Sequence, residues 1–219
     1  MKTKVMVLAL LLLALSALPA LAQDGLTNSV TFNGFSFSYD LTLATNLDIA
    51  IYAGDAPDLQ APGGPDPRRA LFTLYNGGAG DYVPSIWESA GGIIVYRTAD
   101  FAGYEFPSAR LAQLQALLAE RPDLAQYMAY DSQSANSLEL PLMPVMPAGQ
   151  VIRARAEYVD TTSFSGIRYL TVYRQAASPF LANEFRYVYQ GVSADGSTYV
   201  SAIFPVVAPN FPADYDPNF

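Results

Sequence analysis

Four consecutive stretches decide the fold: VIRARAEYV (Val151–Val159), IRYLTVYR (Ile167–Arg174), FRYVYQ (Phe185–Gln190) and TYVSAIFPV (Thr198–Val206). Each alternates aromatic or β-branched residues with polar ones, a period of two that is typical of strands with one buried face. The first pair is joined through Thr161–Gly166, and Asp195-Gly196 between the last pair is a hairpin signal. Sequential strands with short turns predict an antiparallel four-strand meander.

Upstream of these strands, the sequence predicts more β-structure. Val30–Tyr39 alternates on either side of Asn33-Gly34, a dipeptide that favours a tight hairpin turn because both turn positions need positive φ. Apolar residues recur at every second position from Leu47 to Ala53. Two further short strands are expected at Ala70–Tyr75 and Ile93–Tyr96.

One helix is expected at Ser108–Arg121. A stripe of leucines recurs there at helical spacing: Leu111, Leu114, Leu117 and Leu118. Ser108 is the expected N-cap, and Pro122 prevents continuation. The stripe predicts packing onto the sheet, with a partner-binding face as the alternative.

The fold class that follows is α+β. We expect a single domain over residues 23–219, with a largely antiparallel sheet, the C-terminal four-strand meander and one principal amphipathic helix. The segment LPLMPVMPAG, residues 140–149, is expected to be a Pro-rich linker.

The amino-terminal residues 1–22 have the three parts of a secretory signal peptide. A cationic start with Lys2 and Lys4 precedes the apolar run Val5–Leu15, and Ala20-Leu21-Ala22 supplies the small residues for cleavage. The apolar run is shorter than the roughly 20 residues of a membrane-spanning helix. We therefore expect export from a bacterial cell, to the envelope or the medium, with no transmembrane segment in the mature chain.

The composition of the chain excludes several kinds of chemistry. It contains no His and no Cys, and its two lysines leave with the signal peptide. Zinc, copper and haem sites, Ser-His-Asp catalysis and Schiff-base chemistry need these side chains, so no cofactor is expected. Removing Lys2 and Lys4 takes the formal charge from −8 to −10. An acidic chain without a basic stripe is not expected to bind nucleic acid.

The C-terminal part carries a family resemblance. The stretches QVIRARAEYVDTTSFSGIRYLTVYRQ and NEFRYVYQGVSADGSTYVSAIFPV, with the features G-x-R-[YF]-L-T and Y-Q-G-x-[ST]-x-D-G, resemble a group of uncharacterised exported bacterial proteins. This resemblance covers Leu140–Pro212. The opening hairpin and the order of elements are weakly similar to the Mog1/PsbP-like fold, an antiparallel sheet flanked by helices. That likeness implies a binding module more than a catalyst, and it supplies no active site.

Candidate binding residues are aromatic or arginine. Trp87, the one tryptophan, lies on a loop where it can anchor a partner or plug the edge of the core. By alternation, Tyr187 and Tyr189 share one sheet face and Arg186 points to the other. Arg153 and Arg155 are likewise expected to share a face, as are Arg168 and Arg174. Such a Tyr/Arg surface is typical of interfaces. The favoured alternative is that the tyrosine rings complete the core with their hydroxyls in water, and that the arginines pair with Asp and Glu.

Oxygen ligands and acids give only weak motifs. Asp214, Asp216 and Asn218 have the spacing that opens a calcium loop, but Pro217 and the missing Gly and Glu break the motif. Asp55, Asp58 and Asp66 lie on one Pro/Gly-rich loop, where capping of their own backbone is the favoured interpretation over cation binding. No metal site is therefore predicted. Glutamates in strand-rich segments are the candidate acids: Glu88, Glu105, Glu157 and Glu184.

These observations favour an exported, non-enzymatic binding or accessory module for an envelope component, a protein or a glycan. The alternative is a carboxylate-dependent hydrolase acting on carbohydrate, which needs two acids about 5–9.5 Å apart across a cleft. A third interpretation is a scaffold protein that only has to be stable outside the cell.

Overall fold

The computed structural model describes residues 26–78, 81–130, 138–176 and 178–214. The chain divides into two compact units, one ending at Thr45 and the other beginning at Asn46. The expected signal peptide, residues 1–22, lies outside the described residues. Among the helices in the described part of the chain, none is long and apolar enough to cross a membrane.

The first unit contains a two-stranded hairpin of β1 (Thr27–Phe32) and β2 (Phe35–Asp40). Asn33 and Gly34 form its turn with φ of 50° and 82°, so the hairpin expected from the sequence is confirmed. Phe35, Phe37 and Tyr39 line one side, with ring centroids 5.8 and 6.1 Å apart along the strand.

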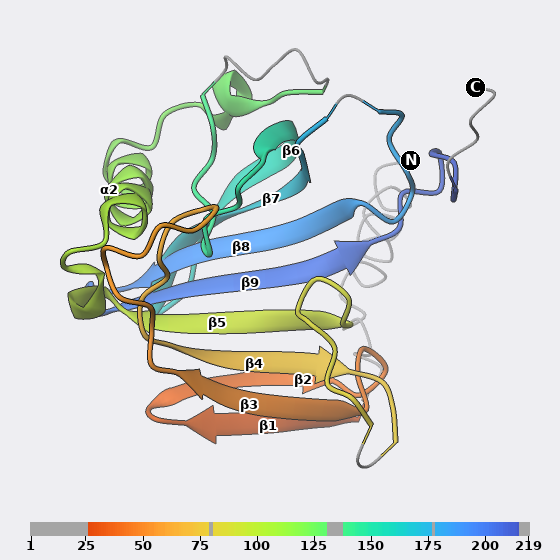
Figure 1. Ribbon diagram of the computed structural model, residues 1–219, viewed down its shortest axis with the longest axis horizontal. Helices are drawn as coiled ribbons and strands as arrows, with labels where there is room; N and C mark the ends of the chain where they lie inside the picture. Colours follow the sequence, from red (N-terminus) through yellow and green to blue (C-terminus); the bar gives the residue numbers. More distant parts are fainter. Residues whose placement is uncertain (1–25, 79–80, 131–137, 177, 215–219) are drawn as a thin grey trace, which may run out of the picture. The chain divides into compact units, whose positions relative to one another are not determined.

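The second unit is built on a seven-stranded sheet in the order β3-β4-β5-β9-β8-β7-β6 (Figure 1). Every neighbouring pair is antiparallel. The strands are β3 (Asn46–Tyr52), β4 (Arg69–Tyr75), β5 (Gly91–Arg97), β6 (Gly149–Asp160), β7 (Phe164–Arg174), β8 (Phe185–Ser193) and β9 (Thr198–Val206). The largely antiparallel α+β class predicted from the sequence is confirmed.

The α-helix of this unit, α2 (Glu105–Glu120), packs over β7 and β8 on one face of the sheet (Figure 1). Leu114 and Leu117 are buried there, which confirms the sheet-packing role of the leucine stripe. The predicted N-cap was wrong: the helix begins three residues earlier, and Ser108 donates from its hydroxyl to the Phe101 carbonyl at 2.9 Å. Pro107 is accommodated because the first-turn N–H groups of a helix have no intrahelical partner.

The main core lies between α2 and the sheet. Alternate strand residues such as Tyr169, Val188 and Tyr199 face α2 and belong to this core. Two 3₁₀ helices, η1 (Thr98–Phe101) and η2 (Leu124–Tyr127), contribute Phe101 and Leu124 to it. We call the face of the sheet that carries α2 the inner face, and the opposite face the outer face.

The Pro-rich segment at 140–149 is largely interior. Leu140, Leu142 and Met143 are each at most 2% exposed and belong to the main core. Two of its backbone N–H groups are bound by glutamine side chains: Leu140 N donates to Gln150 Oε1 at 2.8 Å, and Met143 N donates to Gln190 Oε1 at 3.1 Å. The segment is therefore fixed on the inner face by side chains of the sheet.

Strand β6 departs from simple alternation at two bulges. Register shifts fall between Gln150 and Ile152 and between Ala154 and Glu157, with Arg155 at φ 54° in the second. Arg153 is completely buried, whereas Arg155 is exposed. The expectation that these two arginines share a face was therefore wrong, because each bulge inserts an extra residue and shifts the alternation by one.

Candidate binding surface

Strand β8 carries two tyrosines on the outer face. Val188 belongs to the inner core, and Tyr187 and Tyr189 alternate with it on either side. The structure confirms that these tyrosines share a face and that Arg186 has the opposite parity. Both rings are half-buried.

The Tyr189 ring lies over two glycines that form a cross-strand pair. Gly166 of β7 is directly opposite Gly191 of β8. A β-carbon added at Gly166 would lie 2.6 Å from Tyr189 Cε2, and one added at Gly191 would lie 2.3 Å from the Tyr189 hydroxyl oxygen. Because glycine has no side chain, the Tyr189 ring can lie against the backbone at this pair. Its other side is turned away from the sheet.

A charged pair flanks this ring. Arg168 is directly opposite Tyr189, and Glu157 is directly opposite Arg168 on the next strand. The Arg168 Nε donates to Glu157 Oε1, and this hydrogen bond raises the pKa of the Arg168 guanidinium. Side-chain exposures of 44% and 52% leave both groups accessible to water. We define the outer-face patch as these four residues: Glu157, Arg168, Tyr187 and Tyr189.

The Tyr189 hydroxyl remains protonated at any physiological pH. Burial raises its pKa to about 12, with a smaller contribution from the negative charge of Asp160. Asp160 itself is held by Arg121, whose Nη2 lies 2.7 Å from each carboxylate oxygen. A neutral phenol beside a charged pair offers hydrogen bonding without adding charge.

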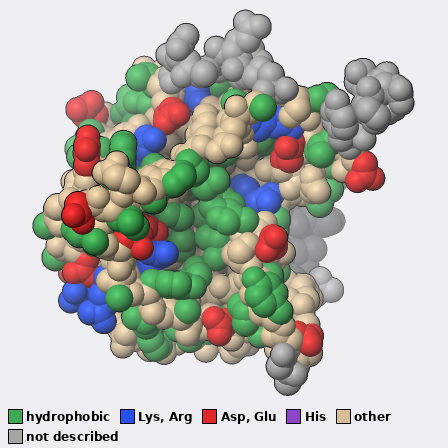
Figure 2. All heavy atoms as spheres, in the orientation of Figure 1, with side chains coloured by type: hydrophobic (Ala, Val, Ile, Leu, Met, Phe, Trp, Pro, Cys, Tyr) green, Lys and Arg blue, Asp and Glu red, His purple; other side chains and the backbone are tan. Residues whose placement is uncertain are grey.

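The other two predicted binding residues lie together on the inner side. Arg186 Nη2 donates to the Trp87 carbonyl oxygen at 3.0 Å, and the Trp87 side chain packs against the main core. The interpretation of Trp87 as a plug at the core edge therefore describes its position. Figure 2 shows this side of the molecule, with a hollow floored by hydrophobic side chains. The four predicted residues thus form two pairs on opposite faces.

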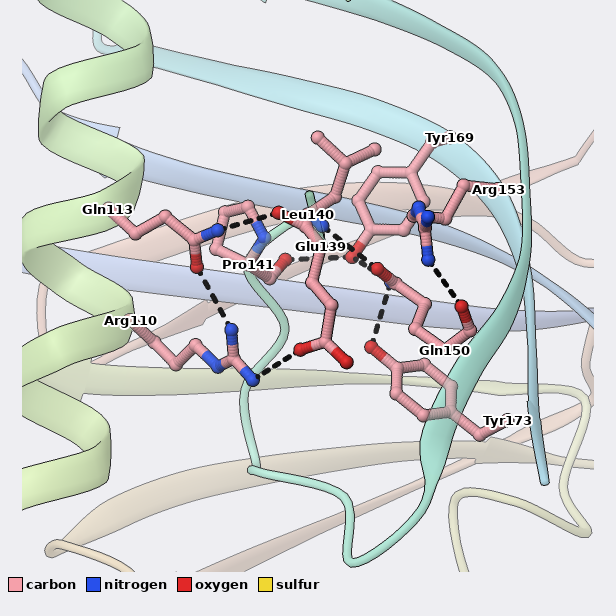
Figure 3. Close-up of polar contacts among 9 residues, drawn as sticks. All are labelled: Arg110, Gln113, Glu139, Leu140, Pro141, Gln150, Arg153, Tyr169 and Tyr173. Atoms are coloured by element: carbon pink, nitrogen blue, oxygen red, sulfur yellow. Dashed lines mark hydrogen bonds and ion pairs between the residues drawn. The ribbon is translucent and has the colours of Figure 1, made fainter. Parts of the chain in front are cut away.

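A buried polar network on the inner face was missed by sequence reasoning (Figure 3). Gln150 Nε2 donates to the Tyr173 hydroxyl at 2.8 Å, and the Tyr169 hydroxyl donates to the Pro141 carbonyl at 2.7 Å. Arg153 donates to the carbonyls of Gln150 and Tyr127. Because burial disfavours their charged forms, the pKa values of Tyr169 and Tyr173 are raised and that of Arg153 is lowered.

This network is an anchor for the main chain. At the end of the network nearest α2, Arg110 Nη2 lies 2.9 Å from Glu139 Oε2, and Gln113 Nε2 donates to the Glu139 carbonyl at 2.6 Å. Its polar groups are therefore engaged in holding residues 139–141 between α2 and β6 (Figure 3). The shift of alternation at the first β6 bulge is what places Gln150 and Arg153 on the same face.

Among the acids, Asp66 has an altered ionisation. Burial raises the pKa of its carboxyl group, and Arg69, with Nη1 3.0 Å from Oδ2, partly opposes that rise. The Tyr96 hydroxyl donates to it at 3.2 Å. Asp55 accepts the Asp66 backbone N–H at 2.9 Å, so backbone capping holds for Asp55, whereas the Asp66 carboxylate is buried and bound by side chains instead.

No group of three or more acids in the described ranges could hold a metal ion. Asp214 is exposed, and Asp216 and Asn218 lie outside the described residues.

The charged partner in the outer-face patch could have been found from the sequence. Counting back from the turn between β6 and β7 places residue 157 opposite residue 168, as the structure has it. The Gly166–Gly191 pair gives no comparable signal, because it depends on the register between β7 and β8, whose connection is long.

Comparisons with protein-family models, with curated proteins and with solved structures give no match. The candidate surface therefore has to be interpreted from its own geometry and chemistry.

Proposed function

We propose that this chain is an exported, non-enzymatic binding module that holds a glycan on the outer face of its C-terminal four-strand meander. The observation that carries the proposal is the Tyr189 ring lying on the Gly166–Gly191 pair. A pyranose ring has an apolar C–H side that stacks on a flat aromatic ring, and a rim of hydroxyls that need hydrogen-bond partners. Tyr189 supplies the flat stacking surface, and Arg168 with Glu157 supplies the hydrogen-bond partners for the hydroxyls.

The rigidity of the surface supports the same proposal. The ring is confined by backbone on one side, and the patch stands on three hydrogen-bonded strands, β6, β7 and β8. A ligand that binds there orders little of the protein, so less free energy is lost on binding. Tyr187 extends the aromatic surface along the same strand, beside Leu170 of β7 and Phe204 of β9.

The rival hydrolase has less support. Asp66 is an acid with a raised pKa, but its carboxylate is already held by Tyr96 and Arg69. Glu157 pairs with Arg168, and Glu184 accepts from Arg174 and from the Leu181 N–H. A general acid on a glycosidase must be free to protonate the leaving oxygen.

The test is affinity electrophoresis through native gels, each of which contains one soluble polysaccharide. Some of these polysaccharides are neutral and the others contain uronic acids. We expect retardation in at least one gel. Tyr189→Ala should weaken retention by at least about tenfold because the stacking surface is lost, and Tyr189→Phe should retain it. Tyr82→Ala is the matched control, since Tyr82 is 83% exposed and lies off the sheet. Equal migration of the unmodified protein and Tyr189→Ala in every gel would refute glycan binding at this ring.

Export is tested separately. If residues 1–22 are removed as proposed, mass spectrometry of the protein isolated from the producing cell's envelope or medium will give Gln23 as the first residue. An intact amino terminus on the mature protein, or its retention in the cytoplasm, would contradict export.

A further inference from the structure

The guanidinium group of Arg186, on the inner face of β8, is only partly used in hydrogen bonds. Arg186 is half-buried, and Nη1 donates to the carbonyls of Asn183 and Phe185. Nη2 donates to the Trp87 carbonyl at 3.0 Å. Nε is buried and has no hydrogen-bond partner in the described part of the chain. Together with the remaining N–H of Nη2, it forms a planar fork that fits the two oxygens of a carboxylate.

The positive charge of this guanidinium is not balanced by an ion pair. In the described ranges, no carboxylate lies within ion-pair distance of Arg186. Glu184 acts on it from further away, but the Glu184 carboxylate is bound by Arg174 and by the Leu181 N–H. Burial lowers the pKa of the Arg186 guanidinium, and the charge of Glu184 opposes this only in part. A half-buried cation without an ion pair is stabilised by an anion that binds beside it.

A second unsatisfied polar atom lies next to this arginine. Thr171 of β7 is directly opposite Arg186, and it has the same parity as Tyr169 and Tyr173, whose side chains face the main core. Thr171 is 1% exposed, and its Oγ1 has no hydrogen-bond partner among the described residues. Because buried polar atoms are nearly always hydrogen-bonded, two unsatisfied atoms on one cross-strand pair indicate a polar group that binds between them.

The surroundings of this pair are apolar. Pro205 of β9 is exposed and directly opposite Arg186, and Val188 with Ile203 forms the next pair on the inner face. The Trp87 side chain packs against the same core. Figure 2 shows blue side chains at the edge of the hollow that is floored by hydrophobic side chains on this side of the molecule. A ligand held at Arg186 by an acid group can therefore place an apolar part against the protein.

We propose that Arg186 and Thr171 bind the carboxylate of an amphipathic acid, and that the hollow on the inner side holds its apolar chain. The class of ligand is a straight-chain fatty-acid anion. Its carboxylate accepts hydrogen bonds from Nε and Nη2 of Arg186 and from the Thr171 hydroxyl, and it balances the buried charge. An inorganic oxyanion would satisfy the same polar atoms but would leave the apolar hollow in contact with water.

The chain has a built-in reporter for this site, because Trp87 is its one tryptophan and its carbonyl is bonded to Arg186. Titrating the chain, purified in the form the producing cell exports, with decanoate should give a saturable change in tryptophan fluorescence. 1-Decanol has the same chain length without the charge and should bind at least about tenfold more weakly. Acetate should give no change over the same concentrations, because it has no apolar chain.

Substitution of the arginine tests its role directly. Arg186→Gln should weaken decanoate binding by at least about tenfold, because the charge and the fork are both lost. Arg97→Gln is the matched control and should leave the affinity unchanged. The Arg97 side chain is 68% exposed and already pairs with Asp100 at 2.7 Å.

Substitution of the threonine separates ligand binding from a purely structural role. Thr171→Val keeps the shape of the side chain and removes the unsatisfied hydroxyl. In the ligand-free chain it should raise the urea midpoint, because a hydroxyl without a partner no longer has to be buried. It should nevertheless weaken decanoate binding by about threefold, because one hydrogen bond to the carboxylate is lost.

Three outcomes would overturn the proposal. The first is a titration with decanoate that gives no saturable change, which would leave the two unsatisfied atoms to a water molecule only. The second is 1-decanol binding as tightly as decanoate. The third is unchanged decanoate affinity in Arg186→Gln, or in Thr171→Val if the arginine variant does not fold. None of these results bears on glycan binding, which depends on the outer face of β6, β7 and β8.

Discussion

The Tyr189 hydroxyl oxygen lies 2.3 Å from where a β-carbon of Gly191 would stand, two residues further along the same strand. This proximity shows that the Tyr189 side chain is directed along β8 and that its ring lies on the backbone. Gly166 on the neighbouring strand completes the bare surface beneath it. The orientation of the main aromatic group of the outer-face patch is therefore set by two positions that have no side chain.

Alanine substitutions at glycines should destabilise the protein in a definite order. A β-carbon at Gly166 would lie 2.4 Å from the Gln190 carbonyl oxygen, and since backbone must move, we expect Gly166→Ala to cost about 3 kcal/mol. Gly191→Ala meets only the Tyr189 side chain and should cost about 1 kcal/mol. Gly149→Ala is the control, because its nearest neighbour would be 3.7 Å away. Urea unfolding measures all three, and a cost at Gly149 equal to that at Gly166 would contradict the geometry.

The two arginines of β6 should respond oppositely to substitution. Arg153→Met removes a buried group that donates to the Gln150 and Tyr127 carbonyls, and we expect a loss of about 2–4 kcal/mol. Arg155→Gly relieves a positive φ at an exposed bulge residue and should change stability by between about 0 and +1 kcal/mol. Thermal or urea unfolding checks both. Strong destabilisation by Arg155→Gly would show that its side chain contributes more than the backbone strain costs.

The side chain of Gln190 should be essential to the placement of the Pro-rich segment. Its amide accepts from Met143 N and from the Tyr199 hydroxyl at 2.7 Å, and donates to Ser201 Oγ at 2.8 Å. Gln190→Leu keeps the volume but leaves these groups unsatisfied, so we expect a loss of about 2–4 kcal/mol. Gln60→Leu, on an exposed loop, is the control. Hydrogen exchange should show faster exchange at Met143 N in the Gln190 variant alone.

The turn between β8 and β9 should make stability depend on pH in the acid range. Hydrogen bonds from Ser193 and Ser197 lower the Asp195 pKa from 3.8 to about 2. A carboxyl whose folded-state pKa is depressed stabilises the fold above its unfolded pKa, and this stabilisation is lost as pH falls through the folded value. The Asp195 contribution should therefore fade between about pH 4 and pH 2.

Comparison of denaturation curves for the unmodified chain and Asp195→Asn measures that contribution. The difference between them should shrink as pH falls through this range. Ser193→Ala combined with Ser197→Ala keeps the carboxylate and the Ser197 N–H donor but removes the two hydroxyl donors, so it should weaken the same dependence. An unchanged difference from pH 5 to pH 2 would contradict the assignment.

Local patterns were enough to predict most of the secondary structure. The alternation in each strand and the Asn33-Gly34 turn depend on residues that are close in sequence, so the hairpin and the strands of the sheet could be predicted. The pairing of Glu157 with Arg168 could be predicted for the same reason, since one short turn sets its register. The start of α2 was misplaced because a proline is tolerated in the first turn, where sequence alone favours a boundary.

The sequence by itself determined the alternating strands, the principal amphipathic helix and the lack of imidazole and thiol side chains. The lack of amine side chains depends on the proposed removal of residues 1–22. Tertiary structure alone decided the orientation of Tyr189 on a cross-strand glycine pair, the burial of Arg153, and the anchoring of Leu140–Met143 by Gln150 and Gln190. The physical reason is range: the Met143–Gln190 hydrogen bond joins residues 47 positions apart, and the Gly166–Gly191 pair exists only in the folded register. Strand bulges that move a side chain from one face to the other leave no periodic mark in the sequence.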